Sequence, residues 1–148
     1  MCGVLATDDA IEFVAIHDAA RCLVTTDTIG RVAAEAYVYG GASAASPVYD
    51  TVKQLDSMGF IQKTVDRSTL VAAETPQVFR KKLYVAAARA AEQKGSSVTD
   101  DNSLLEAFGQ AVKSVLSVGE NFKITTAADL LRAEAVIAER EKKGESRI

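Results

Sequence analysis

The 148-residue sequence is poor in the side chains that most often build disulfide frameworks and metal centres, with two cysteines and one histidine. Cys2 and Cys22 are too few and too poorly placed for a disulfide framework or a zinc site. We expect both to be free thiols in a reducing cytoplasm. The single His17 excludes a histidine-rich metal cluster. A Ser-His-Asp triad would have to use it directly beside Asp18, an arrangement that we do not expect.

The sequence also has no run of basic residues and no long apolar run. The formal net charge is −3, so nucleic acid is not an expected partner. No stretch reaches the length of a membrane span, and no signal peptide is recognisable. What is present is typical of one globular domain: 48% apolar and 25% charged residues over a length that can bury a core. We therefore expect a single domain over residues 1–148 that acts outside the membrane.

Alternating strand and helix patterns predict an α/β fold with a largely parallel sheet. The expected strands are Phe13–Ile16, 42–48 and 111–118, with a projecting hairpin of 51–55 and 60–65 around Asp56. The expected helices are Thr26–Tyr39, stopped by a Gly-Gly pair, then 76–94, 104–109 and 127–143. Their expected starts are Thr75 as N-cap before Pro76, a capping box of Ser103 with Glu106, and a second box of Thr126 with Asp129.

The apolar run Phe13–Ile16 is followed at once by Asp18 and, three residues later, by Arg21. Such a run predicts a strand buried on both faces, as in a parallel sheet. Ligands of open α/β sheets bind outside the carboxyl ends of the strands, so this end offers a metal or phosphate site. The alternative is that Asp18 only caps a turn and Arg21 is a surface charge.

Six short motifs in a fixed order resemble one enzyme family, that of 2-C-methyl-D-erythritol 4-phosphate cytidylyltransferase. The resemblance runs from about Met1 to Ile137 and implies a Rossmann-like nucleotidyltransferase sheet with helices on both faces. The motifs are 17–21 (His-Asp-Ala-Ala-Arg), 47–53 (Pro-Val-Tyr-Asp-Thr-Val-Lys), 65–68 (Val-Asp-Arg-Ser), 74–79 (Glu-Thr-Pro-Gln-Val-Phe), 98–101 (Val-Thr-Asp-Asp) and 121–126 (Asn-Phe-Lys-Ile-Thr-Thr).

One part of the family pattern is missing from this sequence. Members open with a strand and a Gly-rich basic loop that holds the CTP triphosphate, whereas residues 1–5 resemble the second half of a later helix. The resemblance therefore implies a partial domain that lacks the N-terminal CTP-binding segment, and predicts weak or absent CTP binding.

The resemblance also implies a reaction and the residues that serve it. CMP passes from CTP to methylerythritol phosphate, and the attacking phosphate oxygen, already an anion, needs no general base. Asp18 would hold Mg²⁺, a usual ligand type for this ion. Arg67 and Lys123 would be the catalytic cations that position the acceptor phosphate. The substrate would be bound by Asp18, Arg21, Thr51, Thr75 and Thr99.

Some of these residues also have structural interpretations. Thr75 and Thr99 are both suited to cap a helix, and Asp100 and Asp101 compete with Thr99 for that role. Arg67 lies on the hairpin, where a solvated arginine is the ordinary case. Lys123 precedes a helix N-terminus, where the helix dipole disfavours a cation unless an anion is bound in front of it.

The hairpin over residues 51–66 predicts a partner, because an exposed two-stranded arm is marginally stable alone. In the family this arm interlocks with that of a second subunit and delivers residues such as Thr51 and Arg67, so we expect a two-fold homodimer. Two alternative functions stay open at this point. One is a ribitol 5-phosphate cytidylyltransferase, which shares most of the motifs; the other is a non-catalytic, dimerising fragment of a split or truncated enzyme.

Overall fold

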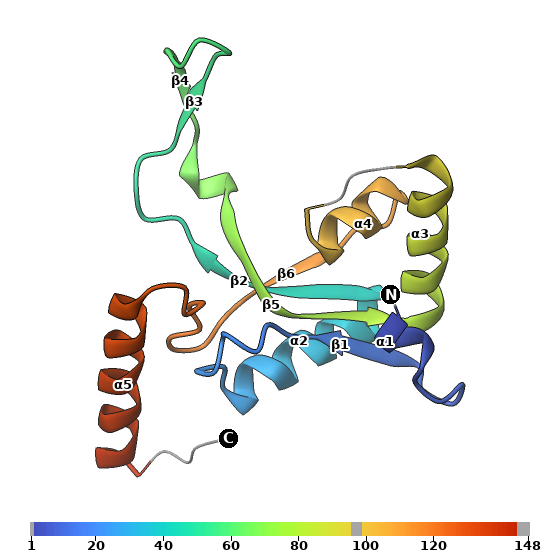
Figure 1. Ribbon diagram of the computed structural model, residues 1–148, viewed down its shortest axis with the longest axis horizontal. Coiled ribbons are helices and arrows are strands. Elements are labelled where there is room, and N and C mark those ends of the chain that lie inside the picture. Colours follow the sequence, from blue (N-terminus) through green and yellow to red (C-terminus); the bar gives the residue numbers. More distant parts are fainter. Residues whose placement is uncertain (1, 96–98, 145–148) are drawn as a thin grey trace.

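A computed structural model describes residues 2–95 and 99–144 of the chain (Figure 1). No helix within these residues is long and apolar enough to cross a membrane. Motif residue Val98 lies outside the described residues. In chain order the elements are α1 (Cys2–Leu5), β1 (Phe13–Ile16), α2 (Thr26–Tyr39), β2 (Gly41–Pro47), β3 (Lys53–Leu55), β4 (Ile61–Thr64), a 3₁₀ turn (Arg67–Thr69), β5 (Val71–Arg80), α3 (Lys81–Lys94), α4 (Asp101–Ala107), β6 (Lys113–Leu116) and α5 (Ala127–Lys142).

The central sheet has the strand order β1-β5-β2-β6, and it is mixed. Only β2 and β6 are parallel, whereas β5 runs antiparallel to both β1 and β2. The prediction of a mostly parallel sheet is therefore wrong. Its cause is β5: the sequence Thr75-Pro76 was interpreted as a helix start, but both residues lie inside this strand, and α3 begins only at Lys81.

The path of the chain explains why β5 is antiparallel. After β2 the chain leaves the sheet, forms the β3–β4 hairpin and returns directly beside β2 as β5 (Figure 1). Strands joined by such a return must run in opposite directions. β1 pairs only with β5 and forms an edge of the sheet, with Ala15 exposed. The expectation that β1 is buried on both faces in a parallel sheet is also wrong.

Helices cover both faces of the sheet, as expected. On one face Val32 and Ala36 of α2 pack against Val78 of β5. On the other face Phe79, the next residue of β5, packs against Tyr84 of α3 and residues of α4. Consecutive strand residues point to opposite faces, so this one strand anchors both layers of the core.

Apart from α3, whose predicted start lies inside β5, the helix boundaries follow the capping signals closely, with one further correction at α4. Thr25 caps α2, which ends at Gly40 with φ of 84°. The predicted box of Thr126 with Asp129 begins α5. The start of α4 is instead a box of Asp100 with Ser103, so the predicted pairing of Ser103 with Glu106 is wrong. An aspartate three residues before a serine satisfies the same free backbone N–H groups.

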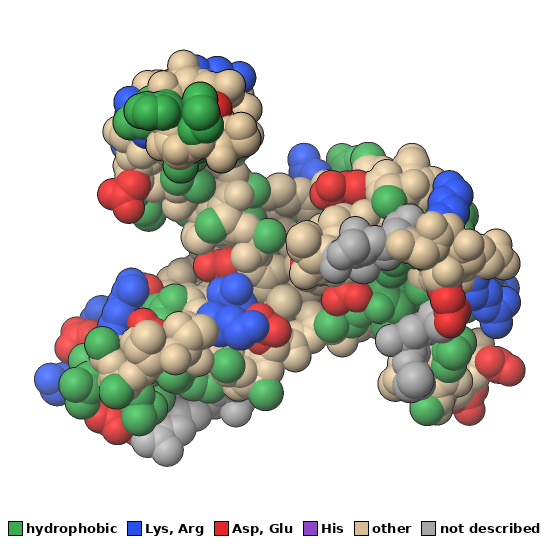
Figure 2. Space-filling view, turned by 45° about the horizontal axis from the view of Figure 1, so that its top comes forward, with side chains coloured by type: hydrophobic (Ala, Val, Ile, Leu, Met, Phe, Trp, Pro, Cys, Tyr) green, Lys and Arg blue, Asp and Glu red, His purple; other side chains and the backbone are tan. Residues whose placement is uncertain are grey.

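The β3–β4 hairpin, hereafter the arm, projects from the body of the molecule (Figure 1). Every residue of β3 and β4 is exposed. The carboxylate of Asp56 shapes the turn by accepting hydrogen bonds from the backbone N–H groups of Met58 and Phe60, both at 2.9 Å. Apolar side chains gather on the arm (Figure 2), among them Leu55, Met58, Phe60 and Ile61.

Helix α5 stands apart from the sheet and is joined to it by the loop of residues 117–126 (Figure 1). Arg132 of α5 donates to Glu120 at 2.6 Å and stacks over the ring of Phe122 at 4.2 Å. Ala133 is the one residue of α5 that is fully buried. The helix is therefore held chiefly by the same loop that carries Lys123.

Candidate functional site

A bulge in β5 shapes the centre of the site. Ser43 of β2 pairs with Gln77 and Ala45 pairs with Ala73, so residues 74–76 of β5 lie opposite the single Ala44. Pro76 has no backbone N–H to donate to a regular ladder. Bulges are common beside functional sites because they redirect side chains. Here the bulge presents Glu74 and Thr75 at the carboxyl end of β1.

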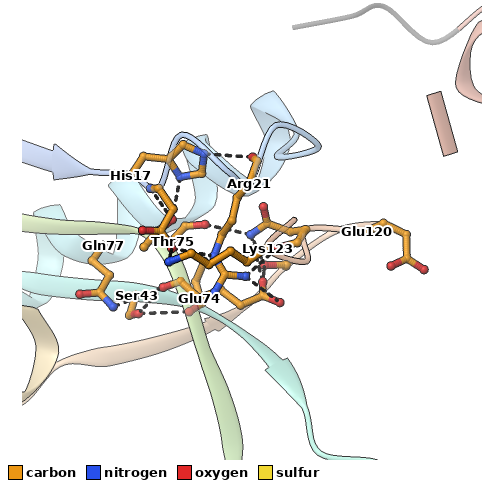
Figure 3. Close-up of polar contacts among 12 residues, drawn as sticks. His17, Arg21, Ser43, Glu74, Thr75, Gln77, Glu120 and Lys123 are labelled. Carbon is orange, nitrogen blue, oxygen red and sulfur yellow. Dashed lines mark hydrogen bonds and ion pairs between the residues drawn. The ribbon is translucent and has the colours of Figure 1, made fainter. Parts of the chain in front are cut away.

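A chain of hydrogen bonds fixes the loop that follows β1 (Figure 3). The Thr75 hydroxyl accepts from the backbone N–H of Asp18 at 3.0 Å and lies 2.9 Å from Nδ1 of His17. Nε2 of His17 is 3.2 Å from the carbonyl oxygen of Arg21. Because a carbonyl only accepts, Nε2 carries the proton, and the Thr75 hydroxyl can donate to Nδ1. His17 is thus a clamp on the loop that bears Asp18 and Arg21.

Asp18, Arg21 and Lys123 form the charged cluster of the site. Oδ2 of Asp18 lies 3.2 Å from Nζ of Lys123 and 3.3 Å from Nε of Arg21. Burial acts to raise the pKa of Asp18, but the hydrogen bonds and charges of Lys123 and Arg21 lower it below its usual value. The carboxylate is therefore ionised at neutral pH. Its other oxygen, Oδ1, has no hydrogen-bond or ion-pair partner among the described residues.

Arg21 is held at two of its three nitrogens. Nε donates to Asp18, and Nη1 donates to the backbone carbonyl of Asn121 at 2.9 Å. Nη1 is also 3.9 Å from Oε1 of Glu74. Nη2 makes no hydrogen bond or ion pair within residues 2–95 and 99–144. The side chain is only 13% exposed, so a nearly buried guanidinium keeps one free nitrogen at the site.

The loop that carries Lys123 is tied to the sheet by buried polar groups. Oε2 of Glu74 accepts from Oγ of Ser117 at 2.6 Å and from Nδ2 of Asn121 at 3.0 Å. The backbone N–H of Ile124 donates to the carbonyl of Ala20 at 2.9 Å, which joins the two loops of the cluster directly. The loop after β6 is therefore fixed on both sides of Lys123.

The structure brings together four of the seven predicted site residues: Asp18, Arg21, Thr75 and Lys123. The interpretation of Thr75 as a helix cap is wrong, since its hydroxyl holds Asp18 instead. Thr51 is exposed at the base of the arm. Arg67 lies in the 3₁₀ turn, where its Nη1 donates to the carbonyl of Tyr49. Neither residue shares a hydrogen bond or ion pair with the charged cluster in the described parts of the chain.

Thr99 lies at a second point beside β5. It does not cap α4, because Asp100 does. Gln77, two residues after Thr75 in β5, donates to the carboxylate of Asp100 at 3.2 Å. This contact holds the segment of Thr99 near the site, although no hydrogen bond joins Thr99 to the charged cluster among the described residues.

Two polar residues of the site, Glu74 and Asn121, were not among the predicted site residues. Both stand inside motifs noted in the sequence, and both side chains are more than nine-tenths buried. A glutamate in a strand is a weak signal by itself. It points to function only when burial shows that its charge has to be matched by protein partners.

The arrangement can bind a phosphate. Two cations converge at the end of β1, and the single free nitrogen of Arg21 is suited to a phosphate oxygen. Within the described residues no group of three His, Cys, Asp or Glu side chains could by itself hold a metal ion. The free Oδ1 of Asp18 does fit a Mg²⁺ ion that takes its other ligands from phosphates and water.

Comparison with known proteins gives consistent matches. The family model for 2-C-methyl-D-erythritol 4-phosphate cytidylyltransferase matches residues 2–139. Proteins of that name from Microcystis aeruginosa and Caldanaerobacter subterraneus are 44% and 46% identical over 93% and 89% of this chain. The chain spans 61% and 58% of the lengths of these two relatives.

Solved structures give the same result. The crystal structure of 4-diphosphocytidyl-2C-methyl-D-erythritol synthase from Anaerococcus prevotii matches with a TM-score of 0.85 and 30% identity, over 92% of this chain and 61% of that one. The cytidylyltransferase structure from Thermus thermophilus matches with a TM-score of 0.79 and 32% identity, over 90% and 64% of the two chains. The overall fold of this chain is therefore one that solved structures already show.

Proposed function

The chain belongs to the 2-C-methyl-D-erythritol 4-phosphate cytidylyltransferase family, and we propose that its site binds methylerythritol phosphate for transfer of CMP from CTP. The observation that carries the proposal is the convergence of Arg21 and Lys123 on Asp18 at the end of β1. In this reaction an oxygen of the acceptor phosphate attacks the α-phosphorus of CTP and forms a new P–O bond. The bond to the β-phosphate breaks, and pyrophosphate leaves with the electron pair.

The charged cluster supplies what this reaction needs from the protein. The attacking oxygen is already an anion, so positioning and charge neutralisation are sufficient and no general base is required. Arg21 offers Nη2 to the acceptor phosphate. Lys123, with 47% of its side chain exposed, can exchange its contact with Asp18 for a phosphate oxygen. Thr75 keeps the loop of Asp18 in place while this happens.

A Mg²⁺ ion, if bound, would be held by Asp18 through its free oxygen. When bound, it neutralises phosphate charge. Asp18 is suited to this role because its low pKa keeps the carboxylate ionised. Lys123, which contacts the other carboxylate oxygen of Asp18, would remain available to the acceptor phosphate.

The proposed partner is a second copy of this chain, engaged through the arm. The arm exposes Leu55, Met58, Phe60 and Ile61, each by more than half of its surface. Such a surface is stabilised when another subunit covers it. Thr51 and Arg67 lie at the base of the arm rather than in the charged cluster, so in a two-fold dimer they would serve the site of the partner. A cytoplasmic location stays a prediction from the cysteine content.

The test is titration calorimetry with 2-C-methyl-D-erythritol 4-phosphate. We expect saturable binding that Lys123→Met weakens roughly tenfold to hundredfold, because a charge-assisted hydrogen bond contributes about 1.5–3 kcal/mol. Lys142→Met, a lysine near the far end of α5, is the matched control and should bind as the original protein does. The absence of binding, or an equal loss in both variants, would overturn the proposal.

Two further titrations distinguish the alternative functions. Tighter binding of ribitol 5-phosphate than of methylerythritol phosphate would overturn the substrate assignment. Titration with CTP and Mg²⁺ tests the expectation of weak or absent CTP binding, which micromolar affinity would contradict.

Light scattering at several concentrations tests the dimer, and Phe60→Asp should shift the protein toward the monomer. A concentration-independent monomer would contradict the role of the arm.

A further inference from the structure

Glu74 is a buried carboxylate for which the proposed reaction gives no direct role. Its side chain is 8% exposed, and it lies 3.9 Å from Arg21 of the charged cluster (Figure 3). Placing an ionised group there is costly unless hydrogen bonds and an opposite charge compensate. The groups that compensate this buried charge lead to both cations of the site.

The contacts of Glu74 run in two directions. Through Oε2 it accepts from Ser117 and from Asn121, which begin and continue the loop that bears Lys123. Through Oε1 it faces Nη1 of Arg21 at 3.9 Å. The backbone carbonyl of Asn121 accepts from the same Nη1 at 2.9 Å. One carboxylate thus joins the strand β5 to the supports of both Arg21 and Lys123.

Glu74 and the backbone carbonyl of Thr75 together orient the side-chain amide of Asn121. Its Nδ2 donates both to Glu74 and to the carbonyl of Thr75 at 2.9 Å, while its Oδ1 is buried without a hydrogen-bond partner among the described residues. Rotating the amide by a half turn would place Oδ1 against a carboxylate and a carbonyl, neither of which can donate. The amide therefore keeps its hydrogen bonds to Glu74 and Thr75, with a longer one of 3.4 Å to Oγ of Ser117, and its own oxygen is left without a partner among the described residues.

We infer that Glu74 is a positioning residue: by fixing Ser117 and Asn121 it holds Lys123 and directs Nη2 of Arg21 toward the acceptor phosphate. This inference rests on the proposed function for the identity of the phosphate. Glu74 does not touch that phosphate; it acts through Asn121, whose carbonyl occupies Nη1 and leaves Nη2 free. Its effect comes from hydrogen-bond acceptance and geometry, since a net negative charge close to the phosphate would by itself oppose binding.

The experiment compares three substitutions in the full chain, with binding of 2-C-methyl-D-erythritol 4-phosphate and of inorganic phosphate as readouts. Glu74→Gln keeps an acceptor for Ser117 and Asn121, so its affinity should stay within about threefold of the original. Glu74→Ala removes the acceptor and should weaken binding about tenfold or more. Ser117→Ala removes one of the two ties and should give an intermediate loss.

A second readout does not depend on any ligand. The Nε–H of Arg21, identified by its loss in Arg21→Lys, should exchange slowly with solvent in the free protein because it is held by Asp18. Exchange should stay slow in Glu74→Gln and become faster in Glu74→Ala. Glu120→Ala is the matched control. It removes a carboxylate from the same loop, but the partner of this carboxylate is Arg132 of α5 rather than a group of the charged cluster.

The outcomes separate the two ideas. If the original protein binds neither phosphate ligand, the proposed function fails, while Arg21 exchange still decides on Glu74. The inference is overturned if Glu74→Ala leaves both binding and exchange unchanged, or if Glu74→Gln is as impaired as Glu74→Ala. If Glu74→Ala does not fold, the comparison of Ser117→Ala with Glu74→Gln decides. Weaker phosphate binding in Ser117→Ala and unchanged binding in Glu74→Gln supports the inference, and any other pattern opposes it.

Discussion

The ion pair of Arg21 with Glu74 provides a sharp test of how burial controls electrostatics in this chain. Its closest nitrogen–oxygen distance is 3.9 Å, and the two side chains are 13% and 8% exposed. The pair of Arg132 with Glu120 is shorter, at 2.6 Å, but its side chains are 56% and 47% exposed. Distance alone predicts a larger coupling energy for Arg132 with Glu120. Burial predicts a larger coupling energy for Arg21 with Glu74.

The magnitudes follow from the geometry. At an effective dielectric of about 20, charges 3.9 Å apart attract by about 4 kcal/mol, and desolvation cancels a large part of this. We expect a coupling energy of about 1–2 kcal/mol for Arg21 with Glu74. Solvent screening and side-chain entropy should hold the coupling of Arg132 with Glu120 below about 1 kcal/mol.

The assay is a pair of double-mutant cycles measured by urea unfolding at neutral pH. One cycle uses Arg21→Met with Glu74→Gln, and the other uses Arg132→Met with Glu120→Gln. Arg21→Met alone should destabilise the fold by about 3 kcal/mol, because it leaves Glu74 buried without its cation. High salt should reduce the exposed coupling more than the buried one. A larger coupling in the exposed pair would refute the reasoning from burial.

Three further predictions concern the folded body. Gly41→Ala should lower the melting temperature and cost about 1–3 kcal/mol, because its Cβ would lie 3.1 Å from the ring of Phe79; an unchanged melting temperature would contradict this. The backbone N–H of Thr125 and neighbouring groups lower the pKa of Asp129 to about 2 from 3.8, so its stabilisation is complete above pH 4 and is lost as the pH falls toward 2. Carboxyl NMR titration checks this value, and Asp129→Asn should flatten the acid limb of stability. Tyr84→Phe removes a hydrogen bond of 2.6 Å to the carboxylate of Asp101 in α4. It should lower the free energy of unfolding in urea by about 1–2 kcal/mol.

The parts of the fold that local chemistry determines were predictable from the sequence. Thr25 and Gly40 bound α2 as their residue types suggest, and the box of Thr126 with Asp129 begins α5. The turn at Asp56 gives the arm. In each case the deciding interactions lie within a few residues along the chain, so the pattern carries the information.

The error at Thr75 and Pro76 shows where local patterns fail. The pair has the residue types of a helix start, and nothing nearby contradicts them. The strands β2 and β1, which pair with β5 on either side of it, lie about thirty and sixty residues away in sequence. Tertiary pairing therefore overrode local propensity. Because β5 was not predicted as a strand, the sheet was predicted to be mostly parallel instead of mixed.

The site was predictable where the sequence places charges together and hidden where the fold does. Asp18 and Arg21 are three residues apart, so their proximity could be expected. Lys123 was placed beside them by family resemblance, and its contact with Asp18 confirms that they lie together. Glu74 and Asn121 meet across β5 and the loop after β6, and nothing in the sequence marks either one as buried.

The exposure of the arm has a consequence for how this chain tolerates sequence change. Because β3 and β4 bury so little, substitutions such as Gln54→Ser or Ile61→Thr remove almost no area from the core. The stability of the body places almost no restriction on the sequence of the arm. A screen that ranks variants by melting temperature would therefore not detect a functional role of the arm. Any restriction on the residues that natural variants carry in the arm therefore comes from contacts outside their own subunit. The pattern of variation in this hairpin would then identify the surface that contacts another molecule.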